Sequence, residues 1–233
     1  MFESEFWYNE GKWIVFAVLI LVAALFLIFL YSKNKLTTKS ITYGAVLISL
    51  AFAFSLLPPI FKMPQGGSIR FLVMLPLFLY AYCFGFFKGV IVCCIYGALD
   101  MLLDPFIVHP LQAILDYPLA YAFLGCAGLF SKITKNQILF LLIGVTMGLV
   151  GRFFCHVLSG VIFFSEYADV ATYGSVFVYS LAYNSFVFVT GAISIGEILI
   201  LYFTKQLKIL TGHLRKANLK ASDRDENIIQ SNY

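Results

Sequence analysis

Three short stretches hold polar side chains that could bind a small molecule, inside a chain that is otherwise mostly apolar. The stretch HPLQAILDYPLA, at 109–120, contains Asp116 and a glutamine one helical turn before it. GRFFCHVLSGVIFF contains His156, and VYSLAYN contains Asn184. A carboxylate, an imidazole and an amide offer hydrogen-bond acceptors and donors to a polar ligand. These side chains therefore indicate a binding site, provided that the fold brings the three stretches together.

The composition of the chain indicates whether these stretches lie in water or in a membrane. Hydrophobic residues make up 61% of the 233 residues and charged residues 12%, and the mean hydropathy is +0.90. A soluble domain is roughly 45–50% apolar and about 25% charged, so the chain is an integral membrane protein. The five cysteines lack the spacing of a zinc site or a disulfide framework, and we interpret them as small hydrophobic side chains.

Seven apolar runs are candidates for membrane helices, each of which needs about 20 residues. They are Trp13–Tyr31, Ser40–Leu57, Arg70–Phe84, Gly89–Leu103, Gln112–Phe130, Ile138–Phe163 and Val176–Phe203. The sequence thus predicts an all-α integral membrane protein in three parts. An acidic segment with an additional first helix occupies 1–35, a six-helix membrane domain occupies 36–205, and a basic to polar cytoplasmic tail occupies 206–233. The tail ends in SDRDENIIQSNY and is predicted to be disordered.

The charges of the loops predict the orientation. With the N-terminus outside and the C-terminus inside, twelve of the sixteen lysines and arginines fall on the inner side and three on the outer side. Such an excess of positive charge is typical of the cytoplasmic side. This topology places Asp116, His156 and Asn184 at similar depth in the outer half of three helices. Ionisable side chains inside a membrane usually face a cavity or the bundle interior, so we predict a pocket open to the outside.

Each polar residue of the first stretch has a second interpretation. Asp116 could be an interfacial carboxylate hydrated by headgroup water, although His156 and Asn184 at matching depth favour the pocket. Gln112 lies one turn before Asp116 on the same helix face, and it could line the pocket or cap the start of the helix. His109 is expected to lie in the preceding loop rather than at a ligand.

Arg152 lies deep in the sixth predicted helix, about 21 Å from the inner end at 1.5 Å per residue, and needs a partner there. Asp100 on the fourth predicted helix is the first candidate and Glu197 the second, so we predict a structural ion pair between Arg152 and Asp100. Asp100 and Asp104 also form an i, i+4 carboxylate pair. Their segment supplies no histidine or third acid, and a metal site there is the less favoured interpretation.

Aromatic residues surround the outer ends of the last two predicted helices; they are Phe163, Phe164, Tyr167, Tyr173 and Tyr179. They could form an ordinary interfacial belt, or one or two of them could form a box for a flat or cationic ligand. The glycine-rich loop MPQGGSIR, at 63–70, is expected to form a turn or a mobile lid. Nothing in this loop resembles the phosphate-binding loop of an NTPase.

Small residues recur every four positions on the second predicted helix, at Ala45, Ser49 and Ala53. This spacing lets another transmembrane helix approach closely. Packing against the chain's own helices is equally compatible with the pattern.

The chain resembles the thiamine-specific substrate-binding subunits (S-components) of energy-coupling factor transporters. The matching segments, in order, are MPQGGSI, HPLQAILDYPLA with the following LGCAGLF, GRFFCHVLSGVIFFSEYA and VYSLAYN. The resemblance covers roughly Ser40 to Lys205 and implies a six-helix bundle, to which Trp13–Tyr31 would be an addition. It also implies a vitamin pocket near the outer face, under the loop that joins the first two helices of the bundle.

The ligand-binding residues that the resemblance implies are Asp116, Tyr117, His156, Phe164, Tyr179 and Asn184, beside Gln112 from the pattern above. The carboxylate of Asp116 would accept a hydrogen bond from the aminopyrimidine, where a family member has the longer glutamate. Phe164 would stack on the thiazolium, where tryptophan is often found. Phenylalanine gives a weaker cation–π contact than tryptophan, so this departure lowers the expected affinity.

The resemblance implies high-affinity capture of extracellular thiamine by one subunit of an ATP-driven importer in the cell membrane. The expected partners are thiamine, membrane lipid and a module made of a membrane-embedded coupling subunit and two cytoplasmic ATPases. This module would dock on the face formed by Ala45, Ser49 and Ala53. No enzymatic activity, cofactor or nucleic-acid partner is expected.

Two alternatives remain open at this stage. The ligand could be a thiamine precursor or another vitamin. The chain could also be a membrane-embedded enzyme, which is less favoured because no compact catalytic motif is present. Its metal ligands or acid–base groups would be Asp100, Asp104, His109 and His156.

Overall fold

Helices form nearly all of the part of the chain that the structure describes. The computed structural model describes residues 36–133 and 136–231, with side chains up to Leu219. The longer helices are α3 (Thr38–Ser55), α4 (Met74–Phe84), α5 (Phe86–Leu103), α8 (Gln137–Phe163), α10 (Val176–Asn184), α11 (Phe186–Phe203) and α12 (Gln206–Ser231). The short pieces are α6 (Pro110–Ile114), the π-helix η2 (Leu115–Leu119), α7 (Ala120–Ala122), the 3₁₀ helices η3 (Phe123–Gly128) and η4 (Ser165–Tyr167), and α9 (Val170–Tyr173). A two-stranded antiparallel hairpin, β1 (Phe61–Lys62) and β2 (Ser68–Ile69), joins α3 to α4.

The prediction of an all-α membrane protein is confirmed. Within the described residues, α3, α5, α8 and the stretch of α10 and α11 are long and apolar enough to cross a membrane, and α4 is a shorter apolar helix. The predicted span Gln112–Phe130 is instead a string of short pieces, α6, η2, α7 and η3. The predicted first helix, Trp13–Tyr31, lies outside the described residues, so the count of seven spans stays a prediction.

The helix α4 occupies the centre of the bundle. All of its residues are buried, and α3, α5, η3, α11 and α12 pack around it. A helix that is apolar on every side is expected in such a position. Tyr80 stacks on Phe84, with ring centroids 4.6 Å apart, and its hydroxyl donates to the carbonyl oxygen of Ser40 at 2.9 Å. This hydrogen bond satisfies a buried polar group and ties α4 to α3.

The string of short helical pieces packs tightly on α5. A Cβ atom added at Gly97 would lie 2.6 Å from the carbonyl oxygen of Tyr117 and 2.9 Å from the Cα of Pro118. A glycine is therefore needed in α5 where η2 approaches it. The contact fixes the depth and rotation of η2, the segment that carries Asp116.

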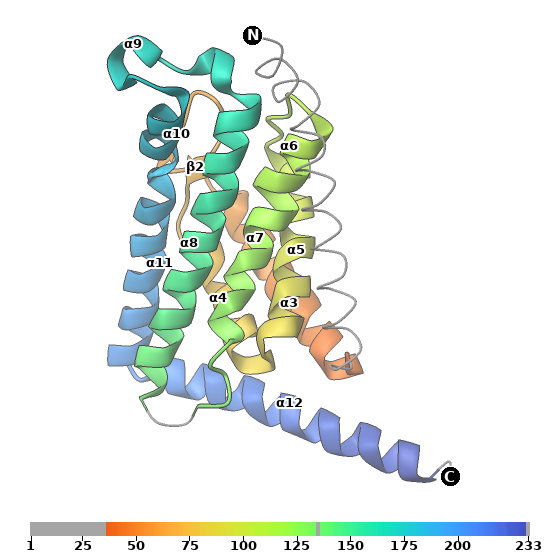
Figure 1. Ribbon diagram of the computed structural model, residues 1–233. Helices are drawn as coiled ribbons and strands as arrows, with labels where there is room; N and C mark the ends of the chain where they lie inside the picture. Colours follow the sequence, from red (N-terminus) through yellow and green to blue (C-terminus); the bar gives the residue numbers. More distant parts are fainter. Residues whose placement is uncertain (1–35, 134–135, 232–233) are drawn as a thin grey trace. The chain divides into compact units, whose positions relative to one another are not determined.

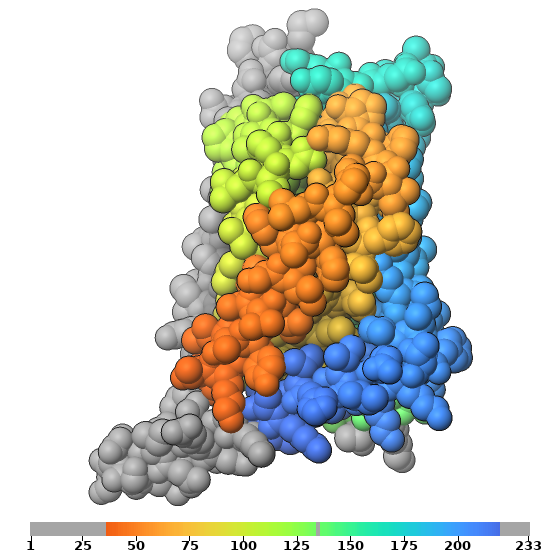
Figure 2. All heavy atoms as spheres, turned by 180° about the vertical axis from the view of Figure 1, so that it is seen from behind, coloured from red at the N-terminus to blue at the C-terminus, as the bar shows by residue number. Residues whose placement is uncertain are grey.

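The helix α3 presents its small residues outward. Figure 2 shows α3 running across one face of the molecule from the α12 end toward the β1–β2 hairpin. Ala45, Ser49 and Ala53 are all exposed, whereas Gly44 lies against Val92 and Tyr80 of the bundle. The three residues therefore do not pack against the helices that the structure describes.

Residues Gln206–Ser231, most of the tail for which the sequence predicts disorder, form the helix α12 in the structure. Figure 1 shows this helix lying across one end of the bundle. Leu207 and Thr211 are buried, and Leu214 packs against the core. These residues recur at intervals of four and three, which places them on one helix face. The polar composition of the tail hid this apolar stripe.

Candidate functional site

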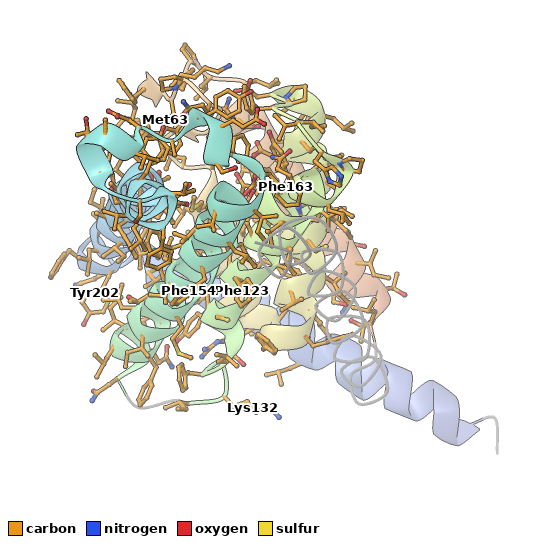
Figure 3. The ribbon with its side chains drawn as sticks, turned by 45° about the horizontal axis from the view of Figure 1, so that its top comes forward. Met63, Phe123, Lys132, Phe154, Phe163 and Tyr202 are labelled. Atoms are coloured by element: carbon orange, nitrogen blue, oxygen red, sulfur yellow. The ribbon has the colours of Figure 1, made fainter. Side chains whose placement is uncertain are left out.

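A cavity of about 170 Å³ lies among the β1–β2 hairpin, α5, the α6–η2–α7 string, α8 and α10. A single water needs only about 10–15 Å³, so this space can hold a small molecule. The predicted ligand-binding residues that line it are Gln112, Asp116, Tyr117, His156, Phe164, Tyr179 and Asn184. The fold thus brings all of them together. Figure 3 shows Met63, which also lines the cavity, far from Lys132 at the other end of the molecule.

Asp116 accepts hydrogen bonds from three side chains at the cavity. Its Oδ2 accepts from Gln112 Nε2 at 2.7 Å and from Ser159 Oγ at 2.6 Å, and its Oδ1 lies 2.9 Å from His156 Nδ1. Gln112 and Ser159 are 2% and 1% exposed, so water does not compete for these bonds. Hydrogen bonds to an ionised acceptor are stronger than neutral ones. The three donors therefore hold a carboxylate in one orientation.

The proton on His156 is fixed by its second neighbour. Arg152 Nε lies 3.3 Å from His156 Nε2, and an arginine can only donate. His156 Nε2 must therefore accept, which leaves the ring proton on Nδ1 to be donated to Asp116. Asn184 Nδ2 donates to the backbone oxygen of His156 at 3.2 Å and to that of Ser180 at 2.9 Å. This bridge sets α10 against α8.

The predicted ion pair between Arg152 and Asp100 is not formed. Asp100 lies 3.5 Å from Arg70 Nη1 and accepts from the hydroxyl of Tyr121 at 2.8 Å. Arg152 instead lies over the ring of Tyr121, 3.9 Å from its centroid, a cation–π contact. Among the described side chains Arg152 pairs with no carboxylate, and its buried Nη1 has no hydrogen-bond partner. The ion-pair partner of Asp100 is Arg70 instead, which comes from the loop before α4.

The second candidate partner of Arg152, Glu197, is also engaged elsewhere. Its Oε1 accepts from the backbone N–H of Leu72 at 2.7 Å. The Asp100–Asp104 pair, considered above for metal binding, is bridged by the same arginine, since Arg70 Nη2 lies 3.3 Å from Asp104 Oδ2. Lys62 lies 2.7 Å from the other oxygen of Asp104. Both carboxylates therefore form ion pairs with basic side chains of the protein itself.

A π-helix places Asp116 and Tyr117 at the cavity. Pro118 has no N–H and its ring would clash with the carbonyl four residues earlier in an α-helix, and the wider turn of η2 accommodates it. Such π segments are frequent at functional sites. The hydroxyl of Tyr117 accepts from the N–H of Phe106 at 2.9 Å and donates to the carbonyl of Asp104 at 3.0 Å. Tyr117 therefore holds the loop between α5 and α6 as well as lining the cavity.

The glycine-rich loop lines the cavity and is held in place by hydrogen bonds to α10. Gly66 and Gly67 have φ values of +85° and +83°, a conformation that favours glycine. The N–H of Gln65 donates to the hydroxyl of Tyr183 at 3.0 Å, and the hydroxyl of Tyr179 donates to Gln65 Oε1 at 3.2 Å. Both tyrosines belong to α10, so the loop and α10 close the cavity together.

Two of the five outer aromatic residues, Phe164 and Tyr179, line the cavity. Phe164 stacks on Phe106, with centroids 5.9 Å apart and planes 22° apart. Phe163 instead stacks on His109 at 5.1 Å. The Nδ1 of His109 accepts from the N–H of Leu111, so His109 caps α6 rather than lining the cavity. Fewer of these aromatic residues therefore line the cavity than the five that the sequence pattern offers.

Sequence reasoning missed several residues of the site, among them Gln65, Phe106, Ser159 and Tyr183. Ser159 could have been found, because it lies three residues after His156 and hence on the same helix face. Tyr183 follows Tyr179 by four and carries the same signal. Phe106 and Gln65 come from loops, whose positions no helical spacing predicts.

Comparisons with known proteins find relatives of this chain. ThiT of Bacillus subtilis (strain 168), a thiamine transporter, is 32% identical over 159 residues, which cover 64% of this chain and 81% of the relative. ThiT of Lacticaseibacillus paracasei is 32% identical over 103 residues, 39% of this chain and 50% of that protein. A solved structure of ThiT from Listeria monocytogenes matches with a TM-score of 0.62 and 26% identity, over 72% of this chain and 96% of that one.

These relatives settle the general class of the chain. They are named as transporters, which confirms the interpretation that the chain is not an enzyme. Together with the apolar helices, they confirm a multi-pass protein of the cell membrane. A family model described as thiamine transporter protein matches residues 41–211, well over half of the sequence, and the chain therefore belongs to the thiamine transporter family.

Proposed function

We propose that this chain binds thiamine in the cavity around Asp116 and serves as the high-affinity substrate-binding subunit of an energy-coupling factor importer. The observation that carries the proposal is the hydrogen-bonding of Asp116. An ionised carboxylate has about four acceptor positions. Gln112 and Ser159 fill those of Oδ2, and His156 takes one on Oδ1. One position on Oδ1 is left for a donor of the ligand, which the aminopyrimidine amine of thiamine supplies.

The other end of thiamine suits the aromatic wall. Its thiazolium ring is flat and permanently cationic, and cations are attracted to the faces of aromatic rings. Phe164, stacked on Phe106, presents such a face to the cavity. The negative charge of Asp116 in the same partly dry space also favours a cationic ligand. Both halves of thiamine therefore have a matching part of the site.

The distribution of charge supports a pocket that opens outside. Lys132, Lys208, Arg215 and Lys216 lie in and beside α12, at the end of the bundle opposite the glycine-rich loop. Basic residues are typical of the cytoplasmic side of membrane proteins. The glycine-rich loop and the cavity beneath it would then face the exterior, where thiamine must be captured.

The energy source would lie in partner proteins. Small residues allow close packing between membrane helices, and the exposed face formed by Ala45, Ser49 and Ala53 offers such a surface for a coupling subunit. The sequence contains no nucleotide-binding motif of its own. ATP hydrolysis by two cytoplasmic ATPases would complete the importer.

Isothermal titration of the detergent-purified protein tests the proposal. Thiamine, a hydroxymethylpyrimidine precursor and riboflavin are titrated into the wild type, into Asp116→Asn and into Glu166→Gln, an exposed acid on the same side. We expect tight one-to-one binding of thiamine that Asp116→Asn abolishes and Glu166→Gln leaves unchanged. Equal or tighter binding of the precursor would reassign the ligand, and retained thiamine binding in Asp116→Asn would reject the site.

A further inference from the structure

The first half of α12 is fastened to the end of the bundle. Besides the buried stripe on its inner face, Arg215 Nη2 donates to the carbonyl of Ser131 at 3.0 Å and lies over the ring of Tyr82, 4.5 Å from its centroid. Asn218 Nδ2 donates to the carbonyl of Cys83 at 3.3 Å, and its Oδ1 accepts from Lys88 at 3.2 Å. These contacts come from three segments of the bundle, so α12 has a fixed inner and a fixed outer face.

The outer face of α12 combines basic and apolar side chains. Lys208, His213 and Lys216 are exposed. Two apolar side chains, Ile209 and Leu219, are 52% and 65% exposed. The stretch 206–219 contains no aspartate or glutamate. Among the side chains that the structure describes, no carboxylate forms an ion pair with either lysine.

The position of α12 matches the level of a membrane surface. Figure 1 shows it lying across the ends of the helices that are apolar enough to cross a membrane, instead of continuing α11. Lys132 lies at the same end of the molecule. The acids whose side chains the structure describes are Asp100, Asp104, Asp116, Glu166 and Asp169, toward the cavity end, and Glu197 within α11, while Asp223, Asp225 and Glu226 lie farther along α12, beyond Leu219. The first half of α12, residues 206–219, thus carries positive charge and no acid of its own.

Most of α12 lies beyond residue 211, where the match to the family model ends. Three of its five outer-face residues, His213, Lys216 and Leu219, lie in that part.

We propose that α12 is an interfacial helix whose outer face binds the anionic phospholipid headgroups of the cytoplasmic leaflet. A basic, partly apolar helix beside a membrane span attracts anionic lipid, with each lysine or arginine contributing to the affinity. Ile209 and Leu219 contact the acyl boundary, while the aliphatic stems of Lys208 and Lys216 lie along it and their ammonium groups reach phosphates. The inner face, held by the bundle, sets the depth of the helix.

Hydrogen exchange of the full-length protein in nanodiscs tests this proposal. Exchange of the amides in Gln206–Leu219 is compared between phosphatidylcholine alone and a mixture with about 30% phosphatidylglycerol. We expect exchange to slow by about five- to tenfold in the anionic lipid, and the effect to vanish near 1 M salt, where the Debye length is about 3 Å. The variant Lys208→Gln/Lys216→Gln should lose this difference. Lys132→Gln, an exposed lysine outside α12, should keep it.

Each other outcome overturns the proposal. Equal exchange in both lipids would show that α12 does not bind anionic headgroups. Slower exchange only after addition of the coupling subunit and ATPases would assign the outer face to a protein partner. Thiamine titration of each variant shows that the bundle is folded, and a difference that persists in Lys208→Gln/Lys216→Gln would place the lipid contact elsewhere.

Discussion

Two carboxylates in the bundle, Asp116 and Glu197, are held in opposite ways. Asp116 accepts hydrogen bonds from three side chains on α6 and α8. Glu197, on α11, accepts one bond from the backbone of Leu72, and its buried Oε2 has no hydrogen-bond partner. An ionised group taken from water is costly unless it is fully hydrogen-bonded or paired. Asp116 is therefore held as a carboxylate by side chains, as the proposed ligand site needs, whereas Glu197 holds a turn of the backbone.

The backbone that Glu197 fastens needs support. Leu72 has a φ of 63°, a left-handed conformation that costs a non-glycine residue about 1–2 kcal/mol. It lies just before Val73 and Met74, which line the lower part of the cavity. The hydrogen bond from Leu72 to Glu197 holds this turn where α4 begins. Under the proposed function Asp116 would contact the ligand directly, whereas Glu197 holds the backbone beside two lining residues of the cavity.

The largest expected effect follows from Asp116→Asn. The amide keeps the size of the carboxylate but removes its charge, and its N–H₂ group would face one of the three donors that now point at Asp116. We expect thiamine affinity to fall at least about 100-fold, or about 2.7 kcal/mol. The thermal unfolding midpoint without ligand should also fall, because one of the donors on Asp116 would lose its acceptor and Gln112 and Ser159 are buried from water. Calorimetric titration and thermal unfolding, measured on one preparation, check both parts.

A smaller loss is expected from Ser159→Ala. Ser159 donates to Asp116 Oδ2 at 2.6 Å, and without it that oxygen is free to rotate toward the ligand or toward water. A hydrogen bond to a charged group contributes about 1.5–3 kcal/mol, so we expect affinity to fall by at least about tenfold. Ser185→Ala is the matched control, because Ser185 is exposed and bonds only to a local carbonyl. Equal affinities for the two variants would show that Asp116 needs no help from Ser159.

The residues of this site could be predicted to different extents from sequence. Asp116, His156 and Asn184 were predicted because polar groups at matching depth in apolar helices require a shared cavity. The partner of Arg152 was predicted wrongly, because depth along a helix does not tell which side chain from a loop arrives there. Arg70 comes from such a loop. Helical spacing predicts faces and depths, whereas loops decide which groups meet.

The fold shows the same division. The spans were predicted from their apolar length, but the π turn at Asp116 depends on Pro118 and on its contact with Gly97 in α5. No pattern within one segment predicts that contact, because Gly97 and Pro118 belong to different helices. The helix α12 was missed because charge and polarity over the whole tail outweighed a stripe of three residues. Local composition therefore predicts that a segment is apolar enough for the membrane, but neither the detailed geometry of that segment nor a narrow buried stripe in a polar one.

A gain in affinity is expected from Phe164→Trp. The ring of Phe164 faces the cavity, and tryptophan gives the strongest cation–π contact of the aromatic side chains. If the thiazolium lies there, affinity should rise about three- to fivefold, which corresponds to about 0.7–1 kcal/mol. Tyr167→Trp serves as the control, because Tyr167 is 48% exposed and lies outside the cavity. Titration with a neutral thiazole analogue should show no gain, and an equal gain would attribute the effect to apolar contact alone.

Glu197→Gln should have the smallest effect on thiamine binding. Most substitutions of buried residues lower the free energy of unfolding, but this one should not. The amide oxygen can still accept from Leu72, while the N–H₂ group replaces an oxygen that has no partner, so one buried charge is removed without breaking the hydrogen bond. We expect the free energy of unfolding to stay equal or rise by about 1 kcal/mol, with thiamine affinity unchanged. Glu197→Leu removes the acceptor as well and should cost about 1–3 kcal/mol, because the N–H of Leu72 is then left unsatisfied. Thermal unfolding of the two variants distinguishes these cases. Equal destabilisation by both would mean that the charge itself, beside the N-terminus of α4, holds the turn at Leu72, and that Glu197 resembles Asp116 more than its hydrogen bonds indicate.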